Sequence, residues 1–574
     1  MKVFQILIGL VWCFSTMSSG CKIAELPTDN VENFEIDSIK VFSPNNEPLY
    51  VNYNINGGRI DALVENDGIT GKFFNVKFVF PKGITPLSIT PDMLKPIDFK
   101  VPVIVDIQYT KTIKKTYTFT LNEEPLNPAK YIIERVDVLN DDNSVSNIKL
   151  SQAGNDYIGL SYNQSAGKRY KLKLTFPSKI TPLSITPDPN ALTDLSKEVI
   201  YTVKYDDQVS KTYSVKIGNY NTNAFTRKIV RGVWVSDVGS DVFATKANIT
   251  ECVNICKDIG INTIFVVTYN DAKTKYKSQV MKDYMGVEID PKYAGRDPLA
   301  EMIEAAKPHG IKVVAWFEYG FASVYGDNSG GALVAKYPSW ASRDAAGNIT
   351  EKNKFYWLDA FNPEVQQFVK KLMVEVVEKY PDLAGVQGDD RLPALASNGG
   401  YNASVTARYK TETGRTAPSN YLDSHWLQWR ADKLSDFGEY IFKHIKSLKG
   451  EQMVSWSPSP FGWSLQNYLQ DWPEWLRRGI VDHVHPQLYR YNFNDYKASF
   501  DQAMNNMSPF NGKELIFSPG ILVGIGSGDS VTPAILDQKL AYNRQRGIEG
   551  ETYFYYERIR KNKGFQEVIK KYNQ

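Results

Sequence analysis

The chain has 574 residues, too many for a single hydrophobic core, because cores stop growing at roughly 250–300 residues. Its 67 basic and 64 acidic residues leave a net charge of only +3, which excludes a broad positive field for binding nucleic acid or an anionic lipid surface. Aromatic residues reach 13% of an otherwise ordinary globular composition, an excess that suits a sugar-binding surface.

The N-terminal segment has the order of an export signal. An apolar run follows Lys2, and small residues lead to Cys21, as in a signal peptide. The run is too short to cross ~30 Å of hydrocarbon as a helix. Ser-Gly-Cys resembles the bacterial lipobox, whose cysteine is acylated after cleavage. We therefore predict a lipoprotein signal peptide over residues 1–20, lipidation at Cys21 and a linker over 21–32, with simple secretion as the alternative.

Two tandem repeats come next. GITPLSITP at 83–91 recurs as KITPLSITP at 179–187, and the same offset carries a Lys-Thr-Tyr triplet from one copy to the other. Alternating polar and apolar segments between turn residues predict strands. We expect two all-β sandwich modules, over 33–125 and 126–222. Neither holds clustered carboxylates or a nucleophile, so we expect spacers, with carbohydrate binding as the alternative.

From about residue 226, short apolar strands alternate with amphipathic helical segments such as 297–310 and 363–380, the pattern of parallel βαβ units. No glycine-rich phosphate-binding motif follows a strand, so we expect no nucleotide cofactor, and none of any other kind. Eight strands with intervening helices fit a (β/α)8 TIM barrel over 226–574. The expected strands are 228–236, 261–269, 311–318, 383–389, 452–458, 480–489, 514–521 and 550–556.

Cysteines and histidines suggest neither a disulfide nor a metal site. Cys252 and Cys256 stand four apart in a helical stretch, a spacing that seldom meets disulfide geometry. We expect both to be small buried apolar side chains. The five histidines are scattered along the chain, so we expect no metal centre.

The candidate catalytic residues are carboxylates at strand ends, because a TIM barrel gathers its functional side chains at the carboxyl ends of its strands. The third expected strand ends at Glu318, and the fourth ends at Asp389 and Asp390. Adjacent carboxylates repel each other and raise one pKa, as a general acid requires. The alternative is a strand-end aspartate that caps the next helix.

Aromatic and amide side chains surround these carboxylates in the expected barrel. Strand-end tryptophans could stack on pyranose rings, and the polar face of the sixth strand could form hydrogen bonds with a sugar. Carboxylates among aromatics and amides favour glycoside hydrolysis, and no GxSxG nucleophile motif competes. The expected substrate-binding residues are Trp234, Trp316, Gln387, Trp456, His485, Gln487 and Tyr489.

Several segments of the barrel region follow one another in a recognisable order: RGVWVS at 231–236, DPLAEMIEAAKPHGIKVVAWFEYGF at 297–321, YWLDAFNPEV at 356–365, SPFGW at 459–463 and QDWPEWLRRGIVDHVHPQLY at 470–489. Together they resemble the bacterial glycosyl-hydrolase-like family 10. The resemblance implies an exported, often lipid-anchored barrel that acts on glycan strands, including peptidoglycan stripped of its peptides. It points to Asp389 and Asp390 as the acidic pair and to Gln487 and Tyr489 at the mouth. The family commonly has an aromatic residue where this chain has Arg391.

The sequence therefore predicts a glycosidase that cleaves O-glycosidic bonds of a polysaccharide or peptidoglycan-type glycan. Asp390 or Asp389 would be the general acid and Glu318 the second carboxylate, with Asp237 as the alternative second group. The seventh expected strand ends without a carboxylate, so a lipid-anchored, non-catalytic glycan-binding protein is the alternative, and a structural envelope protein the third. We expect a monomer that binds a glycan and does not bind nucleic acid. We expect it to contact the outer membrane of the cell envelope through its lipid alone.

Overall fold

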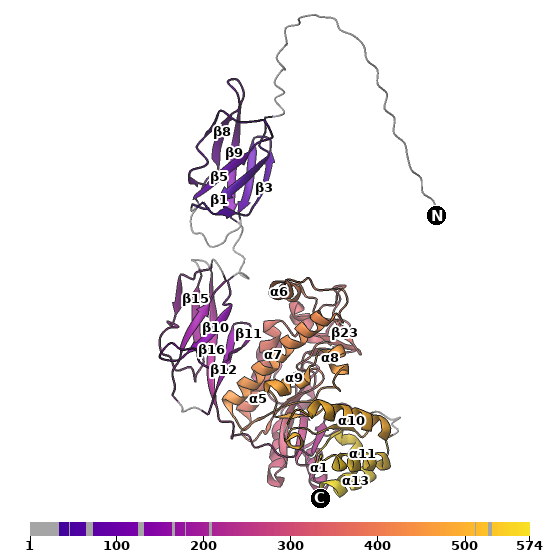
Figure 1. The fold of residues 1–574 in the computed structure, drawn as a ribbon. Coiled ribbons are helices and arrows are strands. Elements are labelled where there is room, and N and C mark those ends of the chain that lie inside the picture. The colour runs from indigo at the N-terminus through magenta and orange to yellow at the C-terminus, as the bar shows by residue number, and fades with distance from the viewer. Residues whose placement is uncertain are drawn as a thin grey trace, which may run out of the picture. The chain divides into compact units, whose positions relative to one another are not determined.

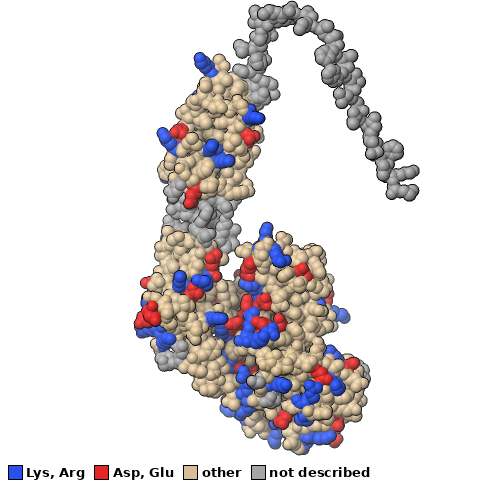
Figure 2. All heavy atoms as spheres, in the orientation of Figure 1, with Lys and Arg blue, Asp and Glu red and all other residues tan. Residues whose placement is uncertain are grey.

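The structure is a computed structural model that describes residues 34–574 except 45, 65–72, 124–130, 164–166, 178–179, 206–208, 511 and 526–530. The expected signal peptide and the lipidation site at Cys21 lie outside the described residues. Over the part that is described, every helix is too short or too polar to cross a bilayer. The chain forms two compact units, Met1–Ile132 with Pro177–Thr181, and Ile133–Phe176 with Pro182–Gln574. On the face shown in Figure 2, basic and acidic side chains are interspersed.

The first unit contains a module of two β-sheets with strand orders β2-β1-β5-β7 and β3-β4-β9-β8-β6. Burial alternates along β4, where Ile60, Ala62 and Val64 face a core that also holds Phe74 and Phe119, as expected of a sandwich. The strands are β1 (Ser38–Phe42), β2 (Pro48–Leu49), β3 (Val51–Asn56), β4 (Arg59–Val64), β5 (Phe73–Val79), β6 (Ser88–Thr90), β7 (Ile97–Asp98), β8 (Val103–Gln108) and β9 (Lys114–Glu123).

A second β module opens the other unit and repeats the larger sheet, with order β11-β12-β16-β15-β14 beside the pair β10-β13. The repeated Ser-Ile-Thr triplets form the edge strands β6 and β14, so this motif has a structural place in both modules. The strands are β10 (Arg135–Leu139), β11 (Ser151–Ala153), β12 (Asp156–Tyr162), β13 (Lys171–Thr175), β14 (Ser184–Thr186), β15 (Val199–Lys204) and β16 (Ser210–Tyr220).

The rest of this unit is an eight-stranded parallel sheet whose strands follow one another in chain order. The last strand pairs with the first, and parallel bridges from Val484 to Phe517 and from Gln487 to Gly520 join the sixth strand to the seventh. The sheet therefore curls into a TIM-like barrel. Its strands are β17 (Gly232–Val235), β18 (Thr263–Val267), β21 (Lys312–Phe317), β25 (Gly385–Gly388), β26 (Met453–Trp456), β27 (His483–Val484), β28 (Gly520–Leu522) and β29 (Thr552–Phe554).

Helices cover the barrel (Figure 1). The two expected helical segments form α3 and α5, and each begins with a side-chain cap, Asp297 and Asn362 respectively, followed by proline at the first helical position. The helices are α1 (Lys246–Asp258), α2 (Gln279–Met285), α3 (Pro298–Ala306), α4 (Gly331–Lys336), α5 (Pro363–Lys379), α6 (Ala403–Thr413), α7 (Ser424–Leu448), α8 (Trp463–Tyr468), α9 (Trp472–Arg478), α10 (Phe493–Met507), α11 (Pro533–Gln545), α12 (Tyr556–Arg560) and α13 (Lys563–Asn573).

The sixth and seventh barrel strands are shorter than the sequence predicts. Only His483–Val484 forms β27, and the seventh expected strand begins instead with a 3-10 turn at Lys513–Leu515 before β28. Pro486 follows β27 and Pro519 precedes β28, and proline has no N–H to donate to a strand ladder. Long apolar runs interrupted by proline therefore form only short strands here.

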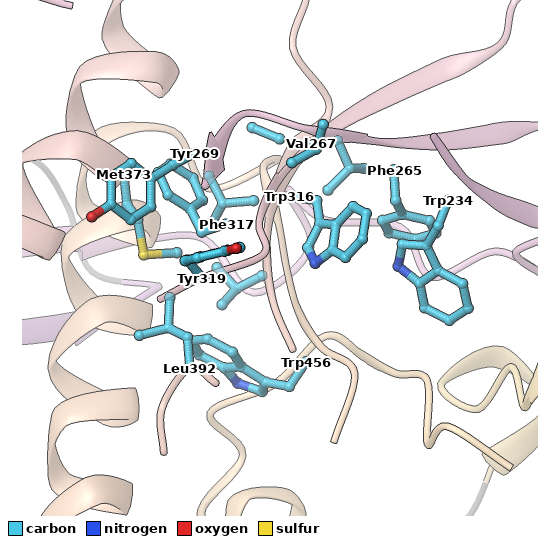
Figure 3. Close-up of a cluster of buried hydrophobic side chains, with 14 of the residues drawn as sticks. Trp234, Phe265, Val267, Tyr269, Trp316, Phe317, Tyr319, Met373, Leu392 and Trp456 are labelled. Atoms are coloured by element: carbon cyan, nitrogen blue, oxygen red, sulfur yellow. The ribbon is translucent and has the colours of Figure 1, made fainter. Parts of the chain in front are cut away.

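The two cysteines of α1 lie as the sequence predicts. Cys252 and Cys256 lie on α1 as free, buried thiols. Large aromatic side chains fill the interior, where Figure 3 shows Trp234, Trp316 and Trp456 among the buried side chains.

Candidate active site

Polar side chains from four consecutive barrel strands meet where those strands end. Asp237 follows β17, Asn270 lies just beyond β18 in the short strand β19 (Tyr269–Asn270), Glu318 follows β21, and Asp389 and Asp390 follow β25. The carboxyl ends of the strands in a closed parallel sheet converge on one mouth, so the topology brings these residues together from distant parts of the chain.

Arg391 connects the three expected catalytic carboxylates. Its Nη2 lies 2.8 Å from an Asp389 oxygen and 3.8 Å from a Glu318 oxygen, and its Nη1 lies 3.2 Å from an Asp390 oxygen. Its Nε donates to the backbone carbonyl of Glu318 at 2.7 Å. The guanidinium also lies 4.7 Å from the ring centroid of Phe355, a cation–π contact that holds it in place. One cation thus faces three acids.

The three carboxyl groups differ in access to solvent. The Asp389 side chain is only 2% exposed and accepts hydrogen bonds from the Trp316 indole at 3.2 Å and from the backbone N–H of Arg391 at 3.0 Å. The Glu318 and Asp390 side chains are 14% and 19% exposed. Asp389 is therefore fixed below the surface, while Glu318 and Asp390 reach the solvent.

Burial changes the proton affinity of this cluster. It raises the pKa of Glu318, with the Arg391 guanidinium and the Asn270 amide opposing that rise. It also raises the pKa of Asp389, where Arg391 again opposes while the charges of Asp390 and Glu318 add to the increase. One guanidinium cannot balance three buried or half-buried carboxylates, so the cluster retains a proton at a pH where an isolated carboxyl group has lost it.

Asp237, the alternative second group, has a different environment. Burial by itself raises its pKa, but Lys275 at 3.1 Å and Lys292 at 2.6 Å lower the pKa to about 2. The Asn270 amide nitrogen donates to Asp237 at 2.9 Å and to Glu318 at 3.0 Å. Asp237 therefore stays ionised near neutral pH, and through Asn270 it positions Glu318.

The expectation that three strand-end tryptophans stack on a sugar needs correction. Trp234, Trp316 and Trp456 are 1%, 3% and 0% exposed, and Figure 3 shows them packed among other buried side chains. A TIM barrel fills its interior with layers of inward-pointing side chains, and these indoles belong to that filling. They present no face to solvent.

Two of the expected polar contacts are also internal. Gln387 is fully buried and accepts a hydrogen bond from the Trp234 indole at 2.7 Å. His485 is fully buried, and its Nδ1 lies 2.9 Å from the Thr552 hydroxyl. Both therefore bond within the barrel and not with a ligand at the mouth, contrary to our expectation.

Gln487 and Tyr489 remain half-buried beyond β27. The Gln487 amide donates to the Ser457 carbonyl at 2.8 Å, and the Tyr489 ring lies 5.1 Å from Phe554. Burial raises the pKa of Tyr489, and the Asp390 carboxylate adds to this increase. Tyr489 is therefore close enough to the acidic pair to respond to its charge.

Several residues of this site were not among the predicted ones. Lys275 and Lys292 hold Asp237, and Asn353 donates to the Tyr468 hydroxyl at 2.8 Å. Burial raises the pKa of Tyr468 to about 12, with a contribution from Asp390. These side chains come from the connections beyond the strand ends, including helix α8, where no sequence periodicity predicts their positions.

Chemically, the mouth combines a carboxyl group of raised pKa with a second carboxylate, both mostly buried but reaching solvent, and a fixed cation. Residues 229–538, more than half of the chain, match the family model described as Glycosyl hydrolase-like 10. The chain belongs to the glycosyl hydrolase-like 10 family. The matched range includes every barrel strand except β29, and so all the carboxylates of the candidate site.

Two curated relatives resemble this glycosyl hydrolase-like 10 member. Glycosyl hydrolase DigH of Escherichia coli K12 is 26% identical over 269 residues, which cover 42% of this chain and 57% of that protein. Glycosyl hydrolase YngK of Bacillus subtilis strain 168 is 26% identical over 303 residues, covering 47% and 56%. The chain thus spans little more than half the length of these relatives. Among solved structures, the PgaB (BpsB) glycoside hydrolase domain of Bordetella bronchiseptica matches with a TM-score of 0.46 and 15% identity, covering 60% of this chain and 99% of that one.

Proposed function

We propose that this protein is a glycoside hydrolase that cleaves O-glycosidic bonds of a polysaccharide or peptidoglycan-type glycan by carboxylate acid/base catalysis. The observation that carries the proposal is the pairing of two solvent-reaching carboxyl groups, Glu318 and Asp390, with one guanidinium at the barrel mouth. Two carboxyl groups around the scissile bond are what glycoside hydrolysis requires. Membership of the glycosyl hydrolase-like 10 family, and relatives that are named glycosyl hydrolases, support this reaction class.

We assign the roles within the expected trio differently from the sequence-based expectation, in which an aspartate was the general acid and Glu318 the second carboxylate. Glu318 has the raised pKa of a general acid and would give its proton to the glycosidic oxygen as the C–O bond breaks. Asp390 would supply the second carboxylate, which either attacks the anomeric carbon or takes a proton from the attacking water. Asp389, bonded to Trp316 and to Arg391, holds the guanidinium in position.

Isosteric substitutions test these roles. With peptidoglycan glycan strands freed of their peptides, we expect Glu318→Gln and Asp390→Asn each to lower kcat roughly 10²- to 10⁴-fold, because each removes acid or base catalysis. Asp382→Asn, at an exposed carboxylate paired with Lys307, is the matched control. Full activity in both Glu318→Gln and Asp390→Asn rules out the assignment.

Export and anchoring are part of the same proposal. We propose that residues 1–20 are removed, that Cys21 carries the lipid, and that the protein resides as a monomer in the cell envelope, lipid-anchored to the outer membrane, where its glycan substrate lies. The lipobox-like sequence before Cys21 supports this. In a Cys21→Ala variant the protein should leave the membrane fraction, and retention there would contradict lipidation.

A non-catalytic glycan-binding protein is the second candidate. It is favoured by Arg391, which pairs with all three acids and so occupies both solvent-reaching carboxylates. A dissociation constant for the glycan strands, together with no released product after prolonged incubation, would select this function over hydrolysis.

A further inference from the structure

Trp463 differs from the other tryptophans of the chain. The sequence has eleven, and of the ten within the described residues nine are at most 9% exposed, whereas Trp463 is 48% exposed. Burying an indole is strongly favourable, so leaving half of one in water forgoes that stabilisation. A single exposed apolar side chain is common on proteins. The exposure of Trp463 points to a function because of where this residue lies.

The backbone presents this indole at the start of α8. Gly462, directly before it, has φ +87°, a backbone conformation that residues with a side chain rarely adopt. The space that a Cβ atom on Gly462 would occupy is open. The Trp463 carbonyl accepts a hydrogen bond from the Asn467 amide at 2.9 Å. The indole meets Tyr468 edge to face, with ring centroids 5.4 Å apart. Trp463 is thus supported on one side and open on another.

Helix α8 is fastened to the loop that carries the acidic pair. The Leu395 N–H donates to the Tyr468 carbonyl at 3.1 Å, and the Gln470 amide donates to the Asp389 carbonyl at 2.8 Å. The Asp390 carboxylate contributes to the raised pKa of Tyr468. The exposed indole therefore contacts Tyr468, the ring that responds to the charge of Asp390.

We propose that Trp463 is the stacking platform of a sugar-binding subsite beside Asp390, where it receives the apolar C–H face of a pyranose ring of the glycan. This rests on the proposed function, because it places a sugar unit next to the reacting carboxylates. Asn353, bonded to the Tyr468 hydroxyl, and Lys352, 5.7 Å from the Tyr468 ring centroid, supply hydrogen-bonding groups for the sugar hydroxyls. An aromatic surface with a few fixed polar groups is the usual composition of a small-ligand site.

Calorimetric binding of peptide-free peptidoglycan glycan strands tests the subsite. The parent is Glu318→Gln, so that the strands are not consumed. We expect Trp463→Ala to raise Kd roughly tenfold or more, and Trp463→Phe to restore part of the affinity because it keeps an aromatic face. Tyr421→Ala, at a 38% exposed tyrosine of the barrel, is the control and should stay within about twofold of the parent.

The measurement separates this inference from the proposed reaction. Because Trp463 is half exposed, its substitution should lower the melting temperature of the parent only modestly and leave the protein folded at the assay temperature, so a loss of affinity reports on binding. Equal Kd values for Trp463→Ala and its parent, or no binding by the parent, overturn the subsite whether or not the wild type hydrolyses the strands. A loss of binding in Trp463→Ala, combined with no hydrolysis by the wild type, overturns the hydrolase and supports the subsite.

Discussion

Burial raises the pKa of Glu318, and the Asn270 amide donates a hydrogen bond to the Glu318 carboxylate at 3.0 Å. A general acid must hold its proton, so activity falls as pH rises through its pKa. We expect kcat/KM to have an alkaline limb set by Glu318 at a pH above the ordinary glutamic acid range. Asn270 donates to the ionised form, so Asn270→Ala should move that limb to higher pH.

A pH–rate profile at constant ionic strength measures this limb in both proteins. Since Asn270 also bonds Asp237, Lys292→Met, which alters Asp237 without touching Asn270, serves as the control for a general change in the site. A limb that moves to lower pH in Asn270→Ala would contradict the role of Glu318 as the acid.

Arg391 compensates a buried charge. Without it, the ionised form of Asp389, 2% exposed, would lose the guanidinium that pairs with it, and an uncompensated buried charge costs about 3–5 kcal/mol. We expect Arg391→Met to lower the free energy of unfolding by up to this amount at a pH where Asp389 is ionised. The folded-state pKa of Asp389 is raised even beside Arg391, so the deficit should grow as pH rises through that raised pKa and vanish below it, where Asp389 is protonated in both proteins.

Chemical denaturation at several pH values measures the effect. Arg408→Met removes an exposed arginine that pairs with Glu412 on α6, and should cost no more than about 0.5 kcal/mol. The double variant Arg391→Met/Asp389→Asn should recover much of the stability, and a double variant as unstable as Arg391→Met would show that the charge of Asp389 is not the cause.

At the scale of elements, the sequence predicted the strand-end carboxylates better than the aromatic side chains around them. The sequence correctly placed Glu318 at the carboxyl end of β21, because that position depends only on where the apolar run of the strand stops. Alternation predicts that the Trp316 side chain points into the barrel, but it does not predict whether that side chain is exposed at the mouth. Its exposure depends on side chains from neighbouring strands, here Trp234 and Trp456, which are also buried.

The loops beyond the strands could not be predicted in the same way. Arg391 was visible as an unusual neighbour of the acidic pair, but its hydrogen bond to the Glu318 carbonyl joins two separate loops. Trp463 ends the SPFGW segment, which carries part of the family resemblance. Its exposure depends on how α8 packs. Local sequence has no signal for such long-range contacts.

Arg430 of α7 organises the loop after β25. Its buried guanidinium donates to the carbonyls of Ser397 at 2.5 Å, Gly399 at 2.6 Å and Tyr421 at 2.6 Å. Burial lowers the pKa of Arg430 to about 9, so it remains charged at neutral pH. Arg430→Met would leave three carbonyls without this donor, and we expect a loss of about 3 kcal/mol or more in unfolding free energy.

Thermal and chemical denaturation of Arg430→Met measure this loss, with Arg415→Met, at an exposed arginine between α6 and α7, as the control. If the loop after β25 depends on Arg430, affinity for the glycan should fall together with stability. Unchanged stability in Arg430→Met would mean that other contacts hold the loop.

On the scale of the whole molecule, the two β modules share a fold but not their surface residues. In the second module, Asp156 of β12 is the register partner of Ser214 on β16. Arg59 of β4 has the equivalent position in the first module, where its register partner is Thr118 on β9. The Asp156 carboxylate forms an ion pair with Lys370 of α5 at 3.0 Å, and Tyr440 of α7 donates to it. Arg59 is 67% exposed and pairs with Asp61 on its own strand.

A close approach accompanies this ion pair. A Cβ atom on Gly218 of β16 would lie 2.2 Å from the Ser447 Cβ of α7, which leaves no room for any side chain. The Lys443 ammonium, also on α7, donates to the Lys149 carbonyl at 2.8 Å and to the Ser151 hydroxyl at 3.0 Å. The second module and the barrel therefore pack as one body.

This packing gives the stability of the second unit a specific pH dependence. Burial alone would raise the pKa of Asp156, but Lys370 and the Ser214 and Tyr440 hydroxyls lower it to about 2. Because the folded pKa lies below the unfolded value, this stabilisation is present above about pH 4 and is lost as pH falls toward 2. We expect Asp156→Asn to cost about 2 kcal/mol at pH 7 and to make no difference at pH 2. Calorimetric melting from pH 7 to pH 2 measures both limits, with Asp106→Asn in the first module as the control. A deficit of equal size at both ends of that range would show that Asp156 acts by shape, and not through its charge.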